Sequence, residues 1–253
     1  MLDDLTIVMP AFNEERRLPL ALDRALAWRA ARAGEFRRLD VLVVDDGSDD
    51  ATGELVRRDF AGSVRLVTRP EHGGKGAAVR TGVEAVRTRW LCFTDADASI
   101  PFEELGVLLA HAERAPVVIG SKRAPGSQLC YPLSRRLLGA LGQRLIALCV
   151  VSGFHDTQCG FKLMRTDVAR ELFRAGTIDG FGFDFELLYL AKRLGHPVVE
   201  VPIRCEHQLG GSIQASTYLS VLGQLARVCS NRVRGVYPSR SRLGHGARGT
   251  LRA

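Results

Sequence analysis

The chain has 253 residues, of which 46% are hydrophobic and 25% are charged. This length suits one large α/β domain or two small ones, and the composition is ordinary for a globular protein with a buried core, which excludes a predominantly disordered chain. The net charge of +7 is unevenly spread, because residues 122–174 hold nine Lys/Arg against three Asp/Glu and residues 204–253 hold eight against one. An acidic part with Asp pairs and a basic part without them indicate a metal site in the first and an anionic partner for the second. Solvated faces of Arg-rich helices are the alternative.

Targeting signals are not expected. The first residues, MLDDLTIVMP, carry acids where a signal peptide carries bases. The apolar run from Leu145 to Val151 is far shorter than the roughly 20 residues that a helix needs to cross a bilayer. The six cysteines form no CxxC pair and have mostly apolar neighbours, which predicts reduced, largely buried thiols in a cytoplasmic protein.

The first half of the chain alternates strands and helices. Short β-branched runs at 5–10 and 40–44 predict buried strands, and leucines at helical spacing predict a helix over 16–33 between them. Such a unit implies a parallel sheet with a right-handed crossover. The pattern continues with helices at 51–60, 75–87 and 102–113 and strands at 64–68, 90–94 and 116–120. It predicts a doubly wound α/β sheet with helices on both faces, whose ligands bind beyond the carboxyl ends of the strands.

The pattern changes after Gly120. We expect helices at 133–151, 184–194 and 217–236, with a strand at 198–203. The helix at 133–151 is amphipathic, with arginines among its leucines. Neither a repeat nor a low-complexity linker divides the chain.

Two carboxylates follow the apolar strand at 90–94. In the sequence Asp95-Ala96-Asp97, the two acids stand two residues apart and can reach one point once the extended backbone breaks. Like charges this close repel unless a cation lies between them. Mg²⁺ or Mn²⁺ fits, since hard divalent ions take carboxylates together with substrate phosphates. An ordinary turn is the alternative.

A second acidic segment follows the strand at 40–44. Asp45 and Asp46 stand at the end of that strand and can reach a nucleotide. The structural alternative is a strand-to-helix turn in which Ser48 or Asp49 caps the next helix. Both interpretations can hold together, because a cap does not use every carboxylate.

Two further segments lie at predicted strand ends. Asn13 and Glu14 follow the first strand and can hydrogen-bond a base or a ribose. The glycine-rich segment at 71–76 precedes a helix, whose N-terminus favours anions, and Lys75 adds a charge for phosphate. The segment lacks the spacing of a P-loop, and a flexible turn is the alternative.

Four motifs occur in one order: PAFNE at 10–14, VVDDGSDDAT at 43–52, GKGAA at 74–78 and DADAS at 95–99. This set resembles the inverting family-2 glycosyltransferases. Downstream, DTQCGFK at 156–162, FDFE at 183–186 and VPI at 201–203 are similar to the branch of dolichyl-phosphate glucosyltransferases and mannosyltransferases. The resemblance covers residues 5 to about 212, and DTQCGFK is its most specific element.

The resemblance implies a GT-A-type fold with a doubly wound mixed sheet flanked by helices. It implies a UDP- or GDP-sugar donor and a polyprenyl phosphate acceptor, with UDP-glucose first and GDP-mannose next. The residues that it assigns to the nucleoside are Pro10, Phe12, Glu14 and Asp46, and the donor-binding set is completed by Asn13, Asp45, Lys75 and Ala96. Asp95 and Asp97 would bind Mg²⁺ or Mn²⁺ and the diphosphate, beside Ser99. Arg123, with Arg135 or Arg136, would meet the lipid phosphate.

The acceptor half departs from the pattern in two ways. Relatives carry a tryptophan after VPxx and a GSK triplet, whereas this chain reads VPIRCE and then GGSI. A hydroxyl acceptor on a small molecule or glycan is therefore an open alternative, and it would need a base such as Asp156 or Asp184. The remaining alternative is a non-catalytic nucleotide-sugar sensor or nucleic-acid binder. The arginines, however, lack the interleaved aromatic residues on which the bases of a single-stranded nucleic acid stack.

From these patterns we expect one domain over 1–237, with a nucleotide-sugar half (1–121) and an acceptor half (122–237), followed by a basic, disordered tail over 238–253. The acceptor phosphate is largely ionised at neutral pH, so its attack on the sugar needs little base catalysis. We expect no nucleic-acid partner and leave a homodimer open.

The chain is expected to be peripheral on the inner face of the membrane. In the helix at 133–151, leucines recur at helical spacing beside arginines, as in a helix that lies in the membrane interface. The alternative is that these leucines, Leu137, Leu138, Leu141, Leu145 and Leu148, pack in the core or in a dimer interface.

Overall fold

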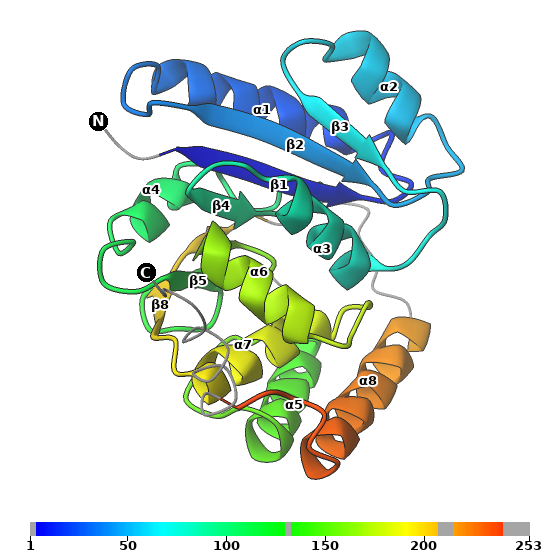
Figure 1. The fold of residues 1–253 in the computed structure, drawn as a ribbon, viewed down its shortest axis with the longest axis vertical. Helices are drawn as coiled ribbons and strands as arrows, with labels where there is room; N and C mark the ends of the chain where they lie inside the picture. Colours follow the sequence, from blue (N-terminus) through cyan, green and yellow to red (C-terminus); the bar gives the residue numbers. More distant parts are fainter. Residues whose placement is uncertain (1–3, 130–132, 207–214, 240–253) are drawn as a thin grey trace, which may run out of the picture.

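The structure is a computed structural model that describes residues 4–129, 133–206 and 215–239 (Figure 1). A seven-stranded sheet crosses the molecule in the order β3-β2-β1-β4-β7-β5-β8. Its strands are β1 (Leu5–Ala11), β2 (Leu39–Asp45), β3 (Arg65–Thr68), β4 (Trp90–Phe93), β5 (Val117–Ser121), β7 (Lys162–Arg165) and β8 (Val198–Pro202). A separate parallel pair joins β6 (Gln128–Leu129) to β9 (Arg204–Cys205).

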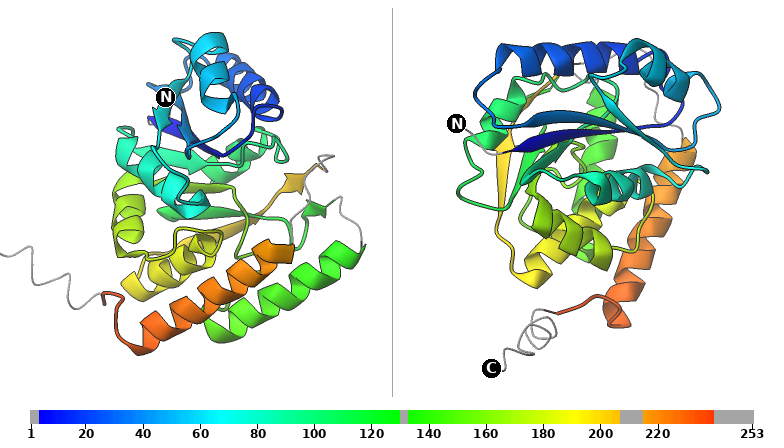
Figure 2. Two further views of the ribbon diagram at one scale, coloured as in Figure 1. Left: turned by 90° about the vertical axis from the view of Figure 1, so that its right-hand side faces the viewer. Right: turned by 45° about the horizontal axis from the view of Figure 1, so that its top comes forward.

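The helices cover both faces of the sheet, as the alternating pattern predicts. They are α1 (Leu18–Ala31), α2 (Thr52–Asp59), α3 (Lys75–Ala85), α4 (Glu104–Leu109), α5 (Leu133–Cys149), α6 (Thr166–Ala175), α7 (Phe183–Leu194) and α8 (Ala215–Val233). Helices α5 and α8 lie side by side on the outside of the molecule (Figure 2). In the part of the chain that the structure describes, no helix has the length and apolarity needed to cross a bilayer.

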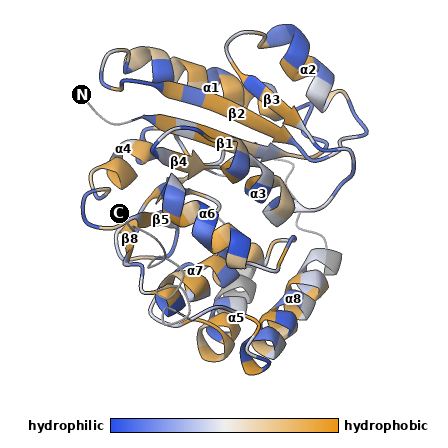
Figure 3. Cartoon of the chain, viewed as in Figure 1, coloured by the Kyte–Doolittle hydropathy of each residue, from blue (hydrophilic) through white to orange (hydrophobic). Residues whose placement is uncertain are grey.

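Two hydrophobic cores lie on opposite faces of the sheet. Successive residues of a strand point to opposite faces, so Val8 packs with α3, α6 and α7, whereas Ile7 and Met9 pack with α1 and α4. The buried strands β1 and β2 are mostly apolar (Figure 3). Helix α3 approaches β1 closely at Gly82, where a Cβ atom would lie 2.5 Å from Val8 Cγ1. This close approach sets the distance between α3 and β1.

The predicted α/β fold is confirmed, and every predicted strand and helix is present with small shifts of its ends. The largest difference is α4, which is shorter than the predicted helix at 102–113. The sequence patterns did not predict β7 and α6, and β7 runs antiparallel to both β4 and β5. The mixed sheet that the resemblance implies is confirmed, but its antiparallel strand was not located in the sequence, because the four residues of β7 are too few to show a periodicity. All but two residues of the predicted tail at 238–253 lie outside the described residues.

The five cysteines that the structure describes are all free. Cys92, Cys159 and Cys205 are buried, as expected, whereas Cys149 is exposed at the end of α5. Cys130 lies outside the described residues.

Candidate active site

The predicted carboxylates converge at one edge of the sheet. Strands β2, β1 and β4 are neighbours and run parallel, so their carboxyl ends lie together. Glu14, Asp46 and Asp95 follow those three ends. The expectation that the motif residues would meet at successive strand ends is confirmed for this donor-side group.

Asp95 forms an ion pair with a lysine. Its Oδ1 atom lies 2.5 Å from the Nζ atom of Lys75, the first residue of α3. Burial raises the pKa of Asp95, but the charges of Lys75, Lys122 and Lys162 outweigh burial and hold that pKa below its usual value. The side chain keeps 31% of its surface exposed, so it remains open to a ligand.

The segment DTQCGFK forms the wall behind Asp95. A Cβ atom on Gly160 would overlap both carboxylate oxygens of Asp95, so only glycine leaves room for that side chain. Two residues later, Lys162 is fully buried and donates to the carbonyl oxygen of Cys159. The most specific motif of the sequence therefore shapes the position of the acid at the end of β4.

Lys162 forms a buried ion pair with Asp184, the second residue of α7. The side chains are 1% and 3% exposed. Burial raises the pKa of Asp184, against the opposing charges of Lys162 and Lys75. Because Lys75 interacts electrostatically with both Asp95 and Asp184, positive and negative groups alternate from the open site into the core.

Asp97 and Glu14 complete the acidic group. Asp97 Oδ1 accepts a hydrogen bond of 2.9 Å from the amide of Ser99 across Ala98, whose φ of 54° is in the left-handed region that alanine seldom adopts. Burial raises the pKa of Glu14, the ion pair with Arg17 opposes that effect, and the charges of Asp97 and Asp95 add to it. The carboxylate of Glu14 thus faces the same space as the Asp pair.

Asp45 and Asp46 are both buried and both bind protein groups. Asp45 Oδ1 accepts a hydrogen bond from the amide of Ser48 at 3.0 Å, so a turn is present. The predicted cap by Ser48 or Asp49 is wrong, because α2 begins after Ala51 without a side-chain cap. Asp46 Oδ2 accepts from the amide of Gly74 at 2.8 Å and lies 2.8 Å from His72 Nδ1. The contacts of this pair therefore fix two loops at the site, the turn after β2 and the glycine-rich segment before α3.

The residues of the PAFNE segment divide between the loop and the open edge. Phe12 is partly exposed, and its ring stacks on His72 with centroids 3.7 Å apart. Pro10 is buried in β1. Asn13 has a φ of 54°, and its Oδ1 atom accepts the amide of Asp49 at 2.9 Å. Asn13 thus shapes the turn, whereas Phe12 and Glu14 face the edge.

The glycine-rich segment differs from the predicted phosphate cradle. The amides of Gly73 and Gly74 donate to Asp46, and the amide of Ala77 donates to the carbonyl of Asp179 at 3.0 Å. Side chains at Gly74 and Gly76 would collide with the backbone at 178–180. Protein groups therefore occupy the amides of Gly73, Gly74 and Ala77, and the ammonium of Lys75 lies beside Asp95 at the open site.

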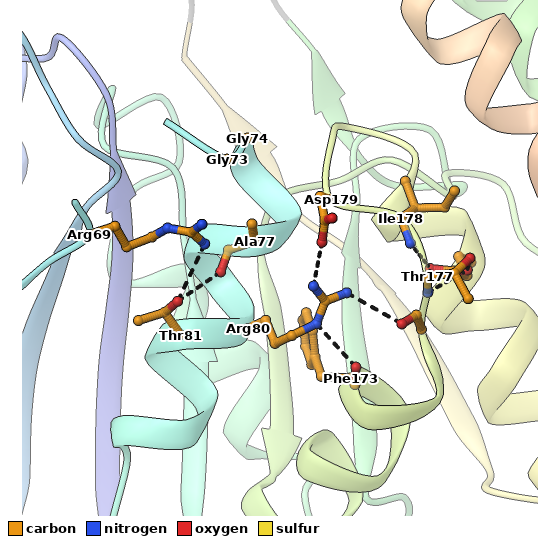
Figure 4. A network of polar contacts seen from close by, with 12 residues as sticks. Arg69, Gly73, Gly74, Ala77, Arg80, Thr81, Phe173, Thr177, Ile178 and Asp179 are labelled. Carbon is orange, nitrogen blue, oxygen red and sulfur yellow. Dashed lines mark hydrogen bonds and ion pairs between the residues drawn. The ribbon is translucent and has the colours of Figure 1, made fainter. Parts of the chain in front are cut away.

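Arg80 holds this cover in place (Figure 4). It forms an ion pair with Asp179 and donates to the carbonyl oxygens of Phe173 at 3.2 Å and Gly176 at 3.4 Å. The segment after α6 is thus tied to α3 directly beside Lys75.

On the acceptor side, Asp156 has a backbone role. Its Oδ2 atom accepts the amide of Lys122 at 3.1 Å, and its Oδ1 atom accepts the amide of Gln158 at 3.2 Å. This buried carboxylate therefore joins the segment after β5 to the segment DTQCGFK. Arg123 lies in the segment after β5. Arg135 and Arg136 are in α5, and their side chains lie outside the described part of the structure.

The sequence patterns named Lys162 and Gly160 only as letters of a motif and gave Lys122 no role. One signal was available for Lys162, because a lysine inside the run GFKLM must be buried if that run is a strand. A buried ammonium requires an acidic partner, and FDFE supplies one.

Comparison with known proteins places these residues in a family. The family described as Glycosyl transferase family 2 matches residues 6–173. A dolichyl-phosphate beta-glucosyltransferase of Drosophila melanogaster is 37% identical over 217 residues, which are 79% of this chain and 66% of that protein. An undecaprenyl-phosphate mannosyltransferase of Micrococcus luteus is 34% identical, with 82% of this chain and 86% of that protein covered. The chain thus spans just under two thirds of the Drosophila protein.

Solved structures show the same fold. Glucosyl-3-phosphoglycerate synthase from Mycobacterium tuberculosis, in complex with Mn²⁺, UDP-glucose and phosphoglyceric acid, matches with a TM-score of 0.66 at 19% identity, covering 90% of this chain and 80% of that one. The predicted GT-A-type fold is confirmed by this likeness.

The buried ion pair generates a stability prediction. Changing Lys162 to Met is expected to lower the free energy of unfolding by about 3–5 kcal/mol, because the carboxylate of Asp184 loses its closest partner inside the core. The double variant Lys162→Met/Asp184→Leu is expected to recover most of that loss. Urea denaturation followed by circular dichroism measures both, with Arg58→Met, at an exposed pair with Asp59, as a control that costs less than about 1 kcal/mol. A single variant no less stable than this control would contradict the prediction.

Proposed function

Because the chain belongs to glycosyl transferase family 2, we propose that it moves a hexose from a nucleotide diphosphate sugar to a polyprenyl phosphate, with inversion at the anomeric carbon. The observation that carries the proposal is the contact of Asp95 with both Lys75 and Gly160. It joins the donor motifs to DTQCGFK, the motif typical of the polyprenyl-phosphate branch. Relatives whose names state dolichyl phosphate or undecaprenyl phosphate as acceptor support this assignment.

The donor is UDP-glucose in this proposal, with GDP-mannose next. The dolichyl-phosphate beta-glucosyltransferases of Drosophila and of humans, at 37% and 32% identity, support glucose, and the Micrococcus protein supports mannose. We assign the nucleoside to Pro10, Phe12 and Glu14 at the edge of β1. Asp46 supports them indirectly, because it fixes His72 against the ring of Phe12.

Asp95 and Asp97 are the residues that would hold a divalent ion. The fit is supported by the contact of Asp95 with an ammonium group, which places positive charge against this carboxylate. Among the described residues no group of three His, Cys, Asp or Glu could hold a metal, so the other ligands would be diphosphate oxygens and water, as Mg²⁺ prefers. When bound, Mg²⁺ or Mn²⁺ supplies charge stabilisation for the departing diphosphate.

The residues of this chain would then align the two reacting groups. An acceptor phosphate oxygen forms the new bond to the anomeric carbon while the bond from that carbon to the nucleoside diphosphate breaks, and the diphosphate leaves with the bonding electrons. Lys75 lies where it can pair with the leaving diphosphate. We assign the acceptor phosphate to Arg123 and Arg135, since guanidinium groups bind phosphate bidentately.

The contacts of the two candidate bases support a phosphate acceptor. A hydroxyl acceptor would need a base to remove its proton, whereas a phosphate is already largely ionised near neutral pH. Asp184 is paired with Lys162 in the core, and Asp156 accepts two backbone amides.

The chain is proposed to act as a peripheral protein at a membrane surface. Leu141 and Leu148 of α5 and Leu219 of α8 are 58%, 83% and 71% exposed. Exposed arginines flank them, namely Arg144, Arg227, Arg232 and Arg234. Apolar residues flanked by bases are typical of helices that lie in the interface of anionic bilayers. The alternative that the leucines of α5 pack in the core is wrong for Leu141, Leu145 and Leu148, which are exposed. The side chains of Leu137 and Leu138 lie outside the described part of the structure.

A transfer assay tests the proposed donor and acceptor. With Mg²⁺ and a polyprenyl phosphate, we expect glucose transfer from UDP-glucose, slower transfer from GDP-mannose, and none after EDTA is added. Thin-layer chromatography of a radiolabelled lipid product measures the transfer. Tight GDP binding without UDP binding in calorimetry would overturn the donor assignment, and transfer to a water-soluble hydroxyl acceptor alone would overturn the lipid acceptor.

The role of Asp97 has a separate test. Changing Asp97 to Asn removes a charge but keeps an oxygen that can accept the Ser99 amide. We expect kcat/KM to fall by at least about 10²-fold. Mn²⁺ affinity, measured by electron paramagnetic resonance with UDP present, should fall as well. The exposed Asp23 of α1 gives the matched control Asp23→Asn, which should change neither quantity. Unaltered Mn²⁺ affinity in Asp97→Asn would refute the metal assignment.

Membrane docking is tested by flotation with phosphatidylglycerol vesicles. We expect the protein to float at low salt, to float less at high salt, and to lose most binding in Leu148→Gln/Leu219→Gln and in Arg144→Glu/Arg227→Glu. Leu20→Gln/Val107→Gln, at residues 46% and 39% exposed on α1 and α4, is the matched control and should float normally. A protein that never floats, yet forms a dimer that the first variant dissociates, would assign this face to a homodimer instead.

A further inference from the structure

Two cysteines meet where the two outer helices end. Cys149 is the last residue of α5, and Cys229 lies near the end of α8, which runs beside α5 (Figure 2). The Cys229 thiol donates to the carbonyl oxygen of Cys149 at 3.6 Å, and the two side chains also interact with each other. The fold thus brings together two thiols that are 80 positions apart in the sequence.

Contacts with the rest of the molecule hold the backbone on both sides of this pair. The carbonyl oxygen of Cys149 also accepts a hydrogen bond from Arg232 Nη1 of α8, at 3.5 Å. The last carbonyls of a helix have no partner within that helix, so α8 satisfies this one. Cys229 packs against the hydrophobic core that contains Val150, the residue directly after Cys149. Neighbouring backbones held in this way are the condition for a disulfide that forms without a large movement.

The two thiols differ in their access to solvent. Cys149 is exposed, whereas Cys229 is half-buried. Burial raises the pKa of the Cys229 thiol, the neighbouring Cys149 adds to this rise, and the charge of Arg232 opposes it. A thiolate attacks a disulfide, and access decides which thiolate attacks first. A soluble reagent therefore reaches Cys149 first, and Cys229 is placed to react second.

The other cysteines that the structure describes lack this combination. Cys92, Cys159 and Cys205 are buried. Burial raises the pKa of the Cys92 thiol, and it raises the pKa of Cys159 to about 12. Buried thiols of this kind are unreactive. Within the described ranges, Cys149 and Cys229 are therefore the two cysteines that combine proximity with access to solvent.

From these contacts we propose that Cys149 and Cys229 form a reversible disulfide in the presence of a low-molecular-weight disulfide. The Cys149 thiolate attacks one sulfur of the small disulfide, whose S–S bond breaks, so that a mixed disulfide forms at Cys149 and one small thiolate leaves. The Cys229 thiolate then attacks the Cys149 sulfur, which forms the bond between the two cysteines and releases the second small thiolate.

The balance of this exchange is closed. The two protein thiols are oxidised, the small disulfide is reduced to two thiols, and the protons of the protein thiols pass through solvent to the released thiolates. The product is a covalent link between α5 and α8. This site does not depend on the proposed sugar transfer.

Oxidised glutathione is the probe for this site. The full chain is incubated with it, free thiols are blocked with N-ethylmaleimide, and tryptic peptides are analysed by mass spectrometry without reduction. We expect a cross-linked pair of peptides that contain Cys149 and Cys229, at least about tenfold more abundant than in the chain unfolded in urea, because the fold holds the two thiols together. Dithiothreitol should remove the cross-link.

Two variants separate the steps of the exchange. In Cys229→Ser, Cys149 should stop at the mixed disulfide with glutathione, and Cys149→Ser should give no cross-link. The matched control is Cys130→Ser, which removes a cysteine outside the pair and should leave the yield of the cross-link unaltered. Circular dichroism should show that all three variants are folded.

Three results would overturn the proposal. The first is a wild-type chain in which Cys149 remains unreacted or stays a mixed disulfide without a cross-link. The second is equal cross-linking in urea, which would remove the role of the fold. The third is a bond between two chains, detected by mixing isotopically labelled and unlabelled protein. Because the readout is a covalent bond, each result is independent of the transfer assay.

Discussion

The ion pair between Lys75 and Asp95 is the interaction on which the arrangement of the site depends. It joins the start of α3 to the residues after β4, and it fits only because Gly160 leaves space behind the carboxylate. The charges of Lys75, Lys122 and Lys162 hold the pKa of Asp95 below its usual value although the side chain is partly buried. A hard cation and a diphosphate would enter where this network already balances positive and negative groups.

The network continues into the core, where removal of one charged group would lower the stability of the fold. Lys162 and Asp184 are almost inaccessible to solvent, and removing one charge leaves the other in a medium of low dielectric constant. Lys162 also lies 5.4 Å from the ring centre of Phe93 in β4, directly below the DADAS segment. The pair therefore ties β7 and α7 to the strand that carries the acidic residues, which explains how motifs far apart in sequence serve one site.

The helices proposed to face the membrane are coupled to this site through one loop. Gln224 of α8 accepts the amide of Gly182 at 2.6 Å, and side chains at Gly180 and Gly182 would collide with it. The same loop carries Asp179, which binds Arg80 of α3, and Phe181, whose ring centre is 5.9 Å from Lys75 Nζ. Helix α8, with its exposed Leu219 and Leu222, is thus two contacts away from the ammonium group at Asp95.

The sequence by itself determined the alternating α/β order, the strand ends that carry the acids, and the family. These features are local: hydrophobic periodicity sets the elements, and parallel strands bring their carboxyl ends to one edge. Only the tertiary structure decided that β7 is antiparallel, that Gly160 and Lys162 lie behind Asp95, and that Asp46 occupies the amides predicted for phosphate. A four-residue strand carries no readable period, and the partner of a buried charge depends on which distant segments fold together.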